Sequence, residues 1–325
     1  MSPRARVVAF VLALAGAAAA VVVGAVLLQS DGDAAPAGPQ ARPPEGRPPL
    51  LLDLGVRVDR EARDLRRGEQ LYGRGRRAAA RDLFARYSST QAQVGLALAG
   101  WPDGSVRSLR RLAAERPRSA VVGLNLGFAL FWSGRRAEAV EEWRRASRAE
   151  PDSLSAVRAD DLLHPNAPRG LPVFVPTAPV PRAISTLRPD RQLAALERAA
   201  RGSDVDARLR YGVALQRLGR RLSARRVYDE AAKLAPRDPE AQVAAAVARF
   251  DKGDPTPAFS RLGPLSRRFP DAPTVRFHLG LLLLWTGAVD EAKTQLQRAV
   301  AIDPSDPLAK EAKRFLARLG DLGTN

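Results

Sequence analysis

The residues that could support catalysis or metal binding are few. The chain has no cysteine and two histidines, His164 and His278, which excludes disulfides, thiolate metal sites and cysteine nucleophiles. Asp160, Asp161 and His164 fall within about one helical turn, but no further histidine or cysteine is available to complete a metal site. No glycine-rich phosphate loop or nucleophile elbow is present. We therefore expect no enzyme activity, metal or cofactor, and interpret these residues as the end of a helix before Pro165.

The strongest local signal is an apolar segment, Val7–Gln29, that contains no charged residue. A helix of this length rises about 35 Å, which is enough to cross the hydrocarbon layer of a membrane. We interpret it as an uncleaved transmembrane anchor. A cleaved signal peptide is the alternative, but signal-peptide cores are about 7–15 residues long and Ala34–Ala37 offers a poor cleavage site.

The charges around this segment predict its orientation. Arg4 and Arg6 precede it and two aspartates follow it, so residues 1–6 are expected in the cytoplasm and the rest of the chain outside the cytoplasmic membrane. Residues 30–56 contain six prolines and are predicted to form a proline-rich flexible linker.

The remainder of the chain repeats with a period of 34 residues. Leu126–Gly134 reads LGFALFWSG, and residues 279–287 read LGLLLLWTG. With repeats starting at 205, 239 and 273, small residues stand at the eighth and twentieth positions, glycine at the fifteenth and proline at the thirty-second. Starts at 86 and 120 continue the pattern. Small residues allow two antiparallel helices to approach closely, glycine follows the first helix, and proline ends the second.

This pattern resembles the tetratricopeptide repeat, which also has an aromatic residue at the twenty-fourth position. The resemblance covers most of residues 61–306. It departs from the family at the fourth position, where Gly123, Arg208, Gln242 and Arg276 replace tryptophan, and at the eleventh, which is leucine in the best copies. It implies an all-α solenoid of about six to seven helix pairs over residues 57–320.

The sequence departs from the regular repeat at both ends of the predicted solenoid and in its middle. A truncated first repeat is expected to begin near Glu61, and residues 307–319 are expected to form a capping helix with Leu308, Ala312 and Phe315 on its apolar face. A proline-rich insertion at about 165–189 interrupts the repeats; its flanks are predicted to form the two helices of one pair, with no helix between them. We expect its apolar residues 173–175 to lie against the superhelix, with the inner groove as one location for them.

The resemblance implies that the first helices line a concave face that binds an extended peptide or a partner helix. The residues it places there are Val121, Leu124, Phe128, Phe131, Trp132, Phe277, Leu281, Leu284 and Trp285. Two interpretations of Trp132 and Trp285 stay open: anchors for a partner, or residues that pack against neighbouring helices. A carboxylate clamp is not expected, because Asn125 stands at the sixth position without the lysines of such clamps.

The formal net charge is +17, carried by 47 arginines and 5 lysines against 35 acids. One interpretation is a basic surface at Arg217, Arg220 and Arg221 that binds an anionic envelope polymer or lipid. The other is a solvated surface in a bacterium whose composition favours arginine and alanine, as in actinobacteria. Nucleic acid is not expected as a partner, because the predicted topology places the domain on the other side of the membrane.

Together these observations predict a single-pass membrane protein, anchored by Val7–Gln29, whose extracytoplasmic repeats act as a scaffold or adaptor for a protein or peptide partner. The alternatives are an envelope protein that binds an anionic polymer or lipid, and a chaperone-like assembly factor for exported proteins.

Overall fold

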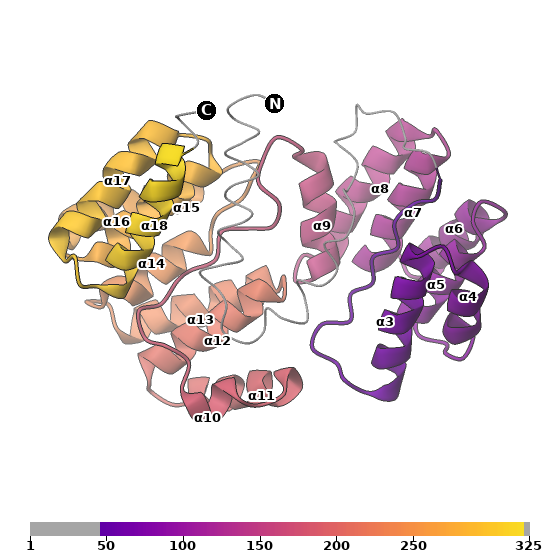
Figure 1. Ribbon diagram of the computed structural model, residues 1–325, viewed down its shortest axis with the longest axis horizontal. Coiled ribbons are helices and arrows are strands. Elements are labelled where there is room, and N and C mark those ends of the chain that lie inside the picture. Colours follow the sequence, from indigo (N-terminus) through magenta and orange to yellow (C-terminus); the bar gives the residue numbers. More distant parts are fainter. Residues whose placement is uncertain (1–45, 322–325) are drawn as a thin grey trace. The chain divides into compact units, whose positions relative to one another are not determined.

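The structure is a computed structural model that describes residues 46–321, and the regular secondary structure in this range is entirely α-helical (Figure 1). The predicted anchor Val7–Gln29 lies outside the described residues. Among the helices that the structure does describe, none combines the length and the apolar character needed to span a membrane.

The described residues divide into two compact units, 46–165 and 166–321. In the first unit, three helical hairpins precede a single helix. These helices are α3 (Arg60–Gly73), α4 (Arg77–Phe84), α5 (Thr90–Ala99), α6 (Ser105–Glu115), α7 (Ala120–Trp132), α8 (Arg136–Ala149) and α9 (Leu154–Leu163). The first helices of the hairpins, α3, α5 and α7, contact one another in order and form one layer.

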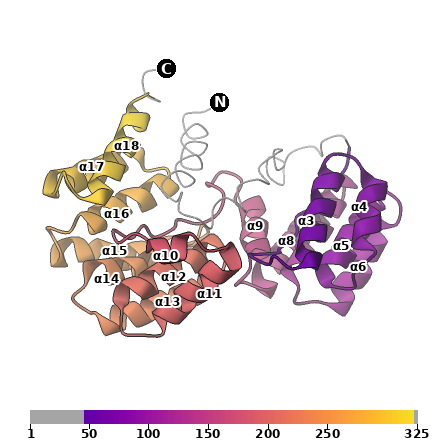
Figure 2. The same cartoon turned by 60° about the horizontal axis from the view of Figure 1, so that its bottom comes forward.

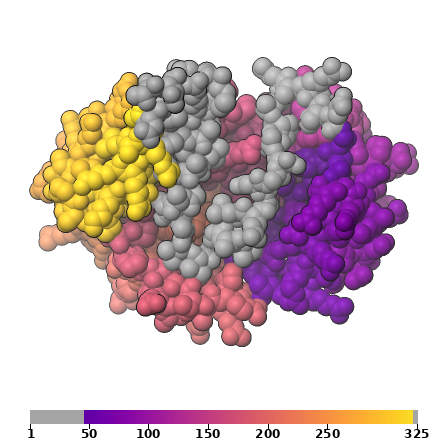
Figure 3. All heavy atoms as spheres, viewed as in Figure 1, coloured from indigo at the N-terminus to yellow at the C-terminus, as the bar shows by residue number. Residues whose placement is uncertain are grey.

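The second unit also contains three hairpins, preceded by two helices and followed by one. Its helices are α10 (Arg182–Ser185), α11 (Pro189–Ala200), α12 (Val205–Arg217), α13 (Arg221–Leu234), α14 (Pro239–Val247), α15 (Thr256–Arg268), α16 (Pro273–Trp285), α17 (Val289–Ile302) and α18 (Pro307–Asp321). Figure 2 shows the stack from α12 to α18, and α12, α14 and α16 form its layer of first helices. Side chains fill the space between these ribbons (Figure 3).

The glycines at the fifteenth position turn the chain between the helices of a hairpin. Gly134, Gly219 and Gly287 have φ values of 79°, 74° and 80°, a region that side-chain-bearing residues rarely adopt. The predicted role of this position is therefore confirmed in the repeats that start at 120, 205 and 273.

The small residues at the eighth position allow the close approach that the sequence predicts. A Cβ atom on Gly212 would lie 2.2 Å from the Tyr228 ring, and one on Gly127 would lie 2.3 Å from the indole nitrogen of Trp143. Both aromatic residues stand at the twenty-fourth position of their repeats and are buried. The aromatic ring of the second helix therefore fills the space that the glycine leaves on the first.

The predicted ends of the repeat array are confirmed. The helices α3 and α4 form a short first hairpin, with Gly68 packed against Phe84. At the other end, α18 buries Leu308, Phe315 and Leu319 against the last hairpin, while its lysines are exposed. This helix covers the apolar surface of α16 and α17.

The middle of the chain differs from the sequence prediction in two ways. The helices that flank the insertion do not form a pair: α9 packs on α7 and α8, and α11 packs on α12, so each belongs to a different unit. The expectation of no helix between them is also wrong, since the short α10 forms directly after Pro181, where residues 182–188 contain no proline. The period alone does not determine which neighbour a helix packs against.

Candidate functional site

The predicted groove residues are mostly buried. On α7, Val121, Leu124, Phe128 and Phe131 are at most 3% exposed, and Trp132 is half-buried with no hydrogen-bond partner for its indole nitrogen among the described residues. On α16, Phe277, Leu281, Leu284 and Trp285 are likewise buried. Trp285 is 5% exposed and packs edge-on against Phe250, so it acts as a packing residue; Trp132 is more exposed and packs edge-on against Phe128 and Phe131.

Each unit instead places an extended segment of the same chain against its first helices (Figure 1). We call residues 47–56 the first strap and residues 169–179 the second strap. In the first strap, alternate residues are buried: Pro48, Leu50, Leu52 and Leu54. This alternation is the side-chain period of an extended chain with one face against a core. Residues 47–56 thus differ from the flexible linker expected for 30–56, because their leucines complete the core of the first unit.

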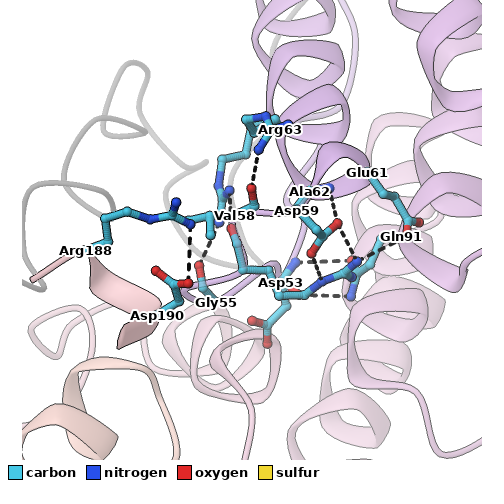
Figure 4. A network of polar contacts seen from close by, with 12 residues as sticks. Asp53, Gly55, Val58, Asp59, Glu61, Ala62, Arg63, Gln91, Arg188 and Asp190 are labelled. Atoms are coloured by element: carbon cyan, nitrogen blue, oxygen red, sulfur yellow. Dashed lines mark hydrogen bonds and ion pairs between the residues drawn. The ribbon is translucent and has the colours of Figure 1, made fainter. Parts of the chain in front are cut away.

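The first strap is held by side chains from successive repeats. The Leu51 N–H donates to Asn125 Oδ1 at 3.1 Å, and Asn125 Nδ2 donates to the Leu51 carbonyl at 2.8 Å. Gln91 makes the same pair with the backbone of Asp53, at 3.2 and 3.1 Å (Figure 4). Arg66 donates to the Gly55 carbonyl at 2.8 Å.

These three side chains share one place in the repeat. Counted from the starts at 61, 86 and 120, Arg66, Gln91 and Asn125 are each the sixth residue. They bind strap residues 55, 53 and 51, so each successive repeat binds the strap two residues further toward its N-terminus. Each step from one repeat to the next, 25 residues and then 34, thereby matches a step of two residues along the extended strap.

Two further hydrogen bonds hold the first strap, one at Pro48 and one at Asp53. The Tyr72 hydroxyl donates to the Pro48 carbonyl at 2.8 Å, and the Ser155 N–H, in the first turn of α9, donates to the Asp53 carboxylate at 3.3 Å. A carboxylate is favoured there because the first N–H groups of a helix have no partner within the helix. The start of α9 therefore favours an acidic residue at position 53 of the strap.

Glu69 places an ionisable group under the first strap. Its Oε1 accepts from the Leu52 N–H at 2.9 Å. Burial raises the pKa of Glu69 to about 7, with the hydrogen bond from Leu52 and the charges of Arg158 and Arg66 opposing the rise. The charge of this carboxyl group therefore changes near neutral pH, in direct contact with the strap.

The second strap is bound by different side chains. The Phe174 N–H donates to Gln216 Oε1 at 3.0 Å, and Gln216 Nε2 donates to the Pro172 carbonyl at 3.4 Å. The Val175 N–H donates to His278 Nε2 at 2.9 Å, and the Thr177 N–H donates to Glu240 at 3.1 Å. The expectation that residues 173–175 lie against the helices is therefore confirmed.

Phe174 anchors the second strap. Its ring is fully buried, stacks on the His278 imidazole at 4.8 Å and 19°, and meets the Tyr228 ring edge-on at 5.8 Å. Since His278 Nε2 accepts a hydrogen bond, the proton is on Nδ1, which donates to the Thr274 carbonyl at 2.8 Å. Burial lowers the pKa of His278 to about 4, so the imidazole is neutral at pH 7.

The three arginines of the predicted basic surface have different environments. Arg217 is half-buried, and burial lowers the pKa of its guanidinium. Arg221 forms an ion pair with Asp251 at 3.2 Å, and Arg220 is exposed. Of the three predicted residues, only Arg220 is exposed. Binding of an anionic polymer or lipid by this surface stays a prediction.

The predicted end of a helix near His164 is present as α9, which ends at Leu163. The His164 side chain lies 3.0 Å from the carbonyl oxygen of Asp160 and 3.2 Å from its carboxylate. Within residues 46–321, no group of histidine and acidic side chains is arranged as a metal site.

The residues that bind the straps were not among the predicted groove residues. One signal was available for Asn125, which is the only polar side chain in the helix sequence AVVGLNLGFALFW. A buried amide needs hydrogen-bond partners, and a helix supplies none to a side chain in its middle except its own carbonyls. Gln91 and His278 occupy the same sixth position, but their helices contain other polar residues, so this signal does not single them out.

Two family models of the tetratricopeptide repeat match the chain, one over residues 212–263 and the other over residues 249–319. The comparison with curated proteins finds no match.

Several solved structures are similar to the chain. A tetratricopeptide repeat protein from Parabacteroides merdae ATCC 43184 shares 13% identity over 82% of this chain and 99% of its own, with a TM-score of 0.33. Yeast Tom70 shares 14% identity over 78% of this chain and 66% of its own, with a TM-score of 0.29. The APC/C hetero-tetramer Cut9–Hcn1 shares 18% identity over 79% of this chain and 55% of the matched chain, with a TM-score of 0.26.

The helical hairpins, their glycine turns and the packing of small residues against aromatic rings extend the pattern of the matched region into the first unit. The repeats in residues 212–319 therefore match the tetratricopeptide repeat family, and the hairpins of the first unit have the same geometry.

Proposed function

We propose that this chain is a bacterial, membrane-anchored scaffold that presents its tetratricopeptide repeats outside the cytoplasmic membrane and binds an extended segment of a protein partner. The binding surface is the layer of first helices in each unit. In this role the chain performs no chemistry of its own, and its anchor is Val7–Gln29.

One observation supports the binding role above the others. The first helices hold extended backbone through side chains that pair with both the N–H and the carbonyl of one residue, as Asn125 does with Leu51. Such pairs recognise an extended chain through atoms that every residue except proline has. A surface of this kind binds peptide segments through their backbone and selects among them through the pockets between the pairs.

Photocrosslinking in cells tests the binding role. A photoreactive amino acid at Trp132, on the first-helix layer, is expected to capture a protein partner. The matched probe at Arg226, exposed on the second helix α13, is expected to capture none. Equal capture at both positions would contradict binding by the first helices.

A protease added to intact cells tests the location. Digestion of residues 46–321 without lysis is expected if the repeats lie outside the cytoplasmic membrane. Protection that disappears only on lysis would contradict the proposed topology. A salt titration of the captured complex then separates the alternatives, because attachment to an anionic polymer weakens steeply with ionic strength and apolar peptide binding does not.

A further inference from the structure

The two straps differ in how firmly they belong to their units. Within the first strap, four alternate residues are buried and three of them are leucines in the core of that unit. Within residues 169–179, only Pro172 and Phe174 are buried. The fully buried apolar area of the second strap therefore comes from one phenylalanine and one proline, while Leu171, Val173 and Val175 are only partly buried against the core.

The second unit also has a core of its own beneath the strap. Its hairpins bury Tyr228, Leu262, Phe277 and Leu296, and α18 covers its last apolar surface. Most of the core cluster of this unit consists of residues of its helices, and Phe174 is the fully buried residue that the strap adds to it. The strap adds one ring, Phe174, between Tyr228 and His278.

We propose that the face of α12, α14 and α16 is an exchangeable peptide site, and that an extended, proline-containing segment of a partner protein without acidic residues binds there by displacing the second strap. The proposal rests on the peptide-binding role given above and names the ligand class and the competitor for one of its two faces. The second strap is then a resident occupant, and the exchange is proposed for this face alone.

The contacts of the second strap define what the partner segment must contain. An aromatic residue is required between Tyr228 and His278, where Phe174 lies. The residue after it must have an N–H group for His278 Nε2, which excludes proline at that point. Prolines are compatible at positions 172, 176 and 179, which donate no hydrogen bond in the strap and favour its extended conformation.

Electrostatics distinguishes this face from the face that holds the first strap. The carboxylate of Glu240 accepts from the Thr177 N–H at 3.1 Å, so an acidic side chain at this point of a ligand would be repelled. On the other face, the Asp53 carboxylate is itself a required group, because it accepts from the Ser155 N–H. A peptide that fits one face is therefore a poor ligand for the other.

Fluorescence anisotropy with a labelled peptide of residues 169–180 tests the exchange. The proteins compared are the intact chain and an open-site variant in which residues 171–177 are replaced by glycine and serine at the same length. The peptide is expected to bind the open-site variant at least about tenfold more tightly, because the tethered competitor acts at an effective concentration in the millimolar range. Equal affinity for the two folded proteins, or no binding to the open-site variant, would overturn the proposal.

Matched variants locate the binding. In the open-site background, Gln216→Ala removes the amide that pairs with the strap and is expected to weaken binding, whereas Gln242→Ala removes an amide that donates to the Ala232 carbonyl away from the strap and is expected to have no effect. A peptide with glycine in place of Phe174, and a peptide of residues 46–57, are expected not to bind. Binding of either with unchanged affinity would refute the assigned ligand class.

A second measurement covers the case in which the open-site variant does not fold. Hydrogen exchange in the intact chain is expected to show the amides of Phe174, Val175 and Thr177 exchanging by local opening while the amides of α16 stay protected. Exchange of both groups only on global unfolding would overturn the proposal. Concentration-dependent dimers that form through the second strap would also overturn it, by making a second copy the occupant.

Failure of this test and failure of the proposed function are distinguishable. If the strap does not exchange but the probe at Trp132 captures a partner, the scaffold role stands and the exchange is wrong. If the peptide binds the open-site variant but no partner is captured in cells, the site exists and the scaffold role is unsupported.

Discussion

Acidification is expected to destabilise the second unit through one residue, His278. The imidazole is fully buried, accepts from the Val175 N–H and stacks on Phe174. Protonation would place a charge between two aromatic rings and would remove the acceptor for Val175, since imidazolium has no lone pair. The neutral form is therefore required by the folded state.

The magnitude follows from the difference between the folded and unfolded pKa values. Burial lowers the pKa of His278 from 6.5 to about 4. Each pKa unit corresponds to about 1.4 kcal/mol, so the destabilisation is on the order of 3 kcal/mol. Because the folded pKa is the lower one, the unfolded state binds more protons between pH 6.5 and 4. Stability is therefore complete above pH 6.5, falls as the pH decreases to about 4, and changes no further below it on account of this group.

The assay is hydrogen exchange followed by mass spectrometry for the peptides that cover the second strap and α16, measured between pH 7 and 4 and corrected for intrinsic exchange. The control is His278→Gln, whose amide oxygen can accept from the Val175 N–H without titrating. Glu240 also contacts the strap, and burial raises its pKa, but it contributes equally in both proteins. The opening free energy of these peptides in the unaltered protein, measured relative to His278→Gln, is expected to decrease by about 3 kcal/mol on acidification. The same pH dependence in both proteins would refute the reasoning.

Three further predictions concern single positions. Burial raises the pKa of Glu69 from 4.5 to about 7, so the charged form is disfavoured in the folded state. The free energy of unfolding of the first unit should therefore decrease by up to about 3 kcal/mol as the pH rises through this range. In thermal melts, Glu69→Gln should abolish that pH dependence. Gly212→Ala should destabilise the second unit by about 1–3 kcal/mol, because the added methyl group meets the Tyr228 ring at 2.2 Å; the control Gly320→Ala, an exposed site in α18 where an added Cβ has no neighbouring atom within 4 Å, should be neutral or stabilising in the same urea titration. Asn125→Ala should cost about 1–3 kcal/mol by leaving a backbone N–H and a carbonyl of the first strap unpaired, and unchanged exchange of the strap amides would contradict this role.

Most of the fold could be predicted because its rules are local. The turn at Gly219 and the contact of Gly212 with Tyr228 involve residues within one repeat, so the spacing of residue types along the chain describes them directly. The capping helix was predictable for the same reason, since Leu308 and Phe315 lie on one face of a single helix. The site was predictable in part: the resemblance placed α7 and α16 on the binding layer, but it selected their apolar residues.

The sequence by itself determined the repeats, their turns and their closing helix, since each depends on side chains a few residues apart. Only the tertiary structure decided what lies on the first helices. Leu51 meets Asn125 across 74 residues and Val175 meets His278 across 103. A hydrogen bond to backbone atoms leaves almost no trace in residue type, because nearly every residue offers the same N–H and carbonyl groups. The period also did not show that α9 packs on α7 and α8 while α11 packs on α12, because the spacing of small residues and prolines does not specify which neighbouring helix a helix contacts.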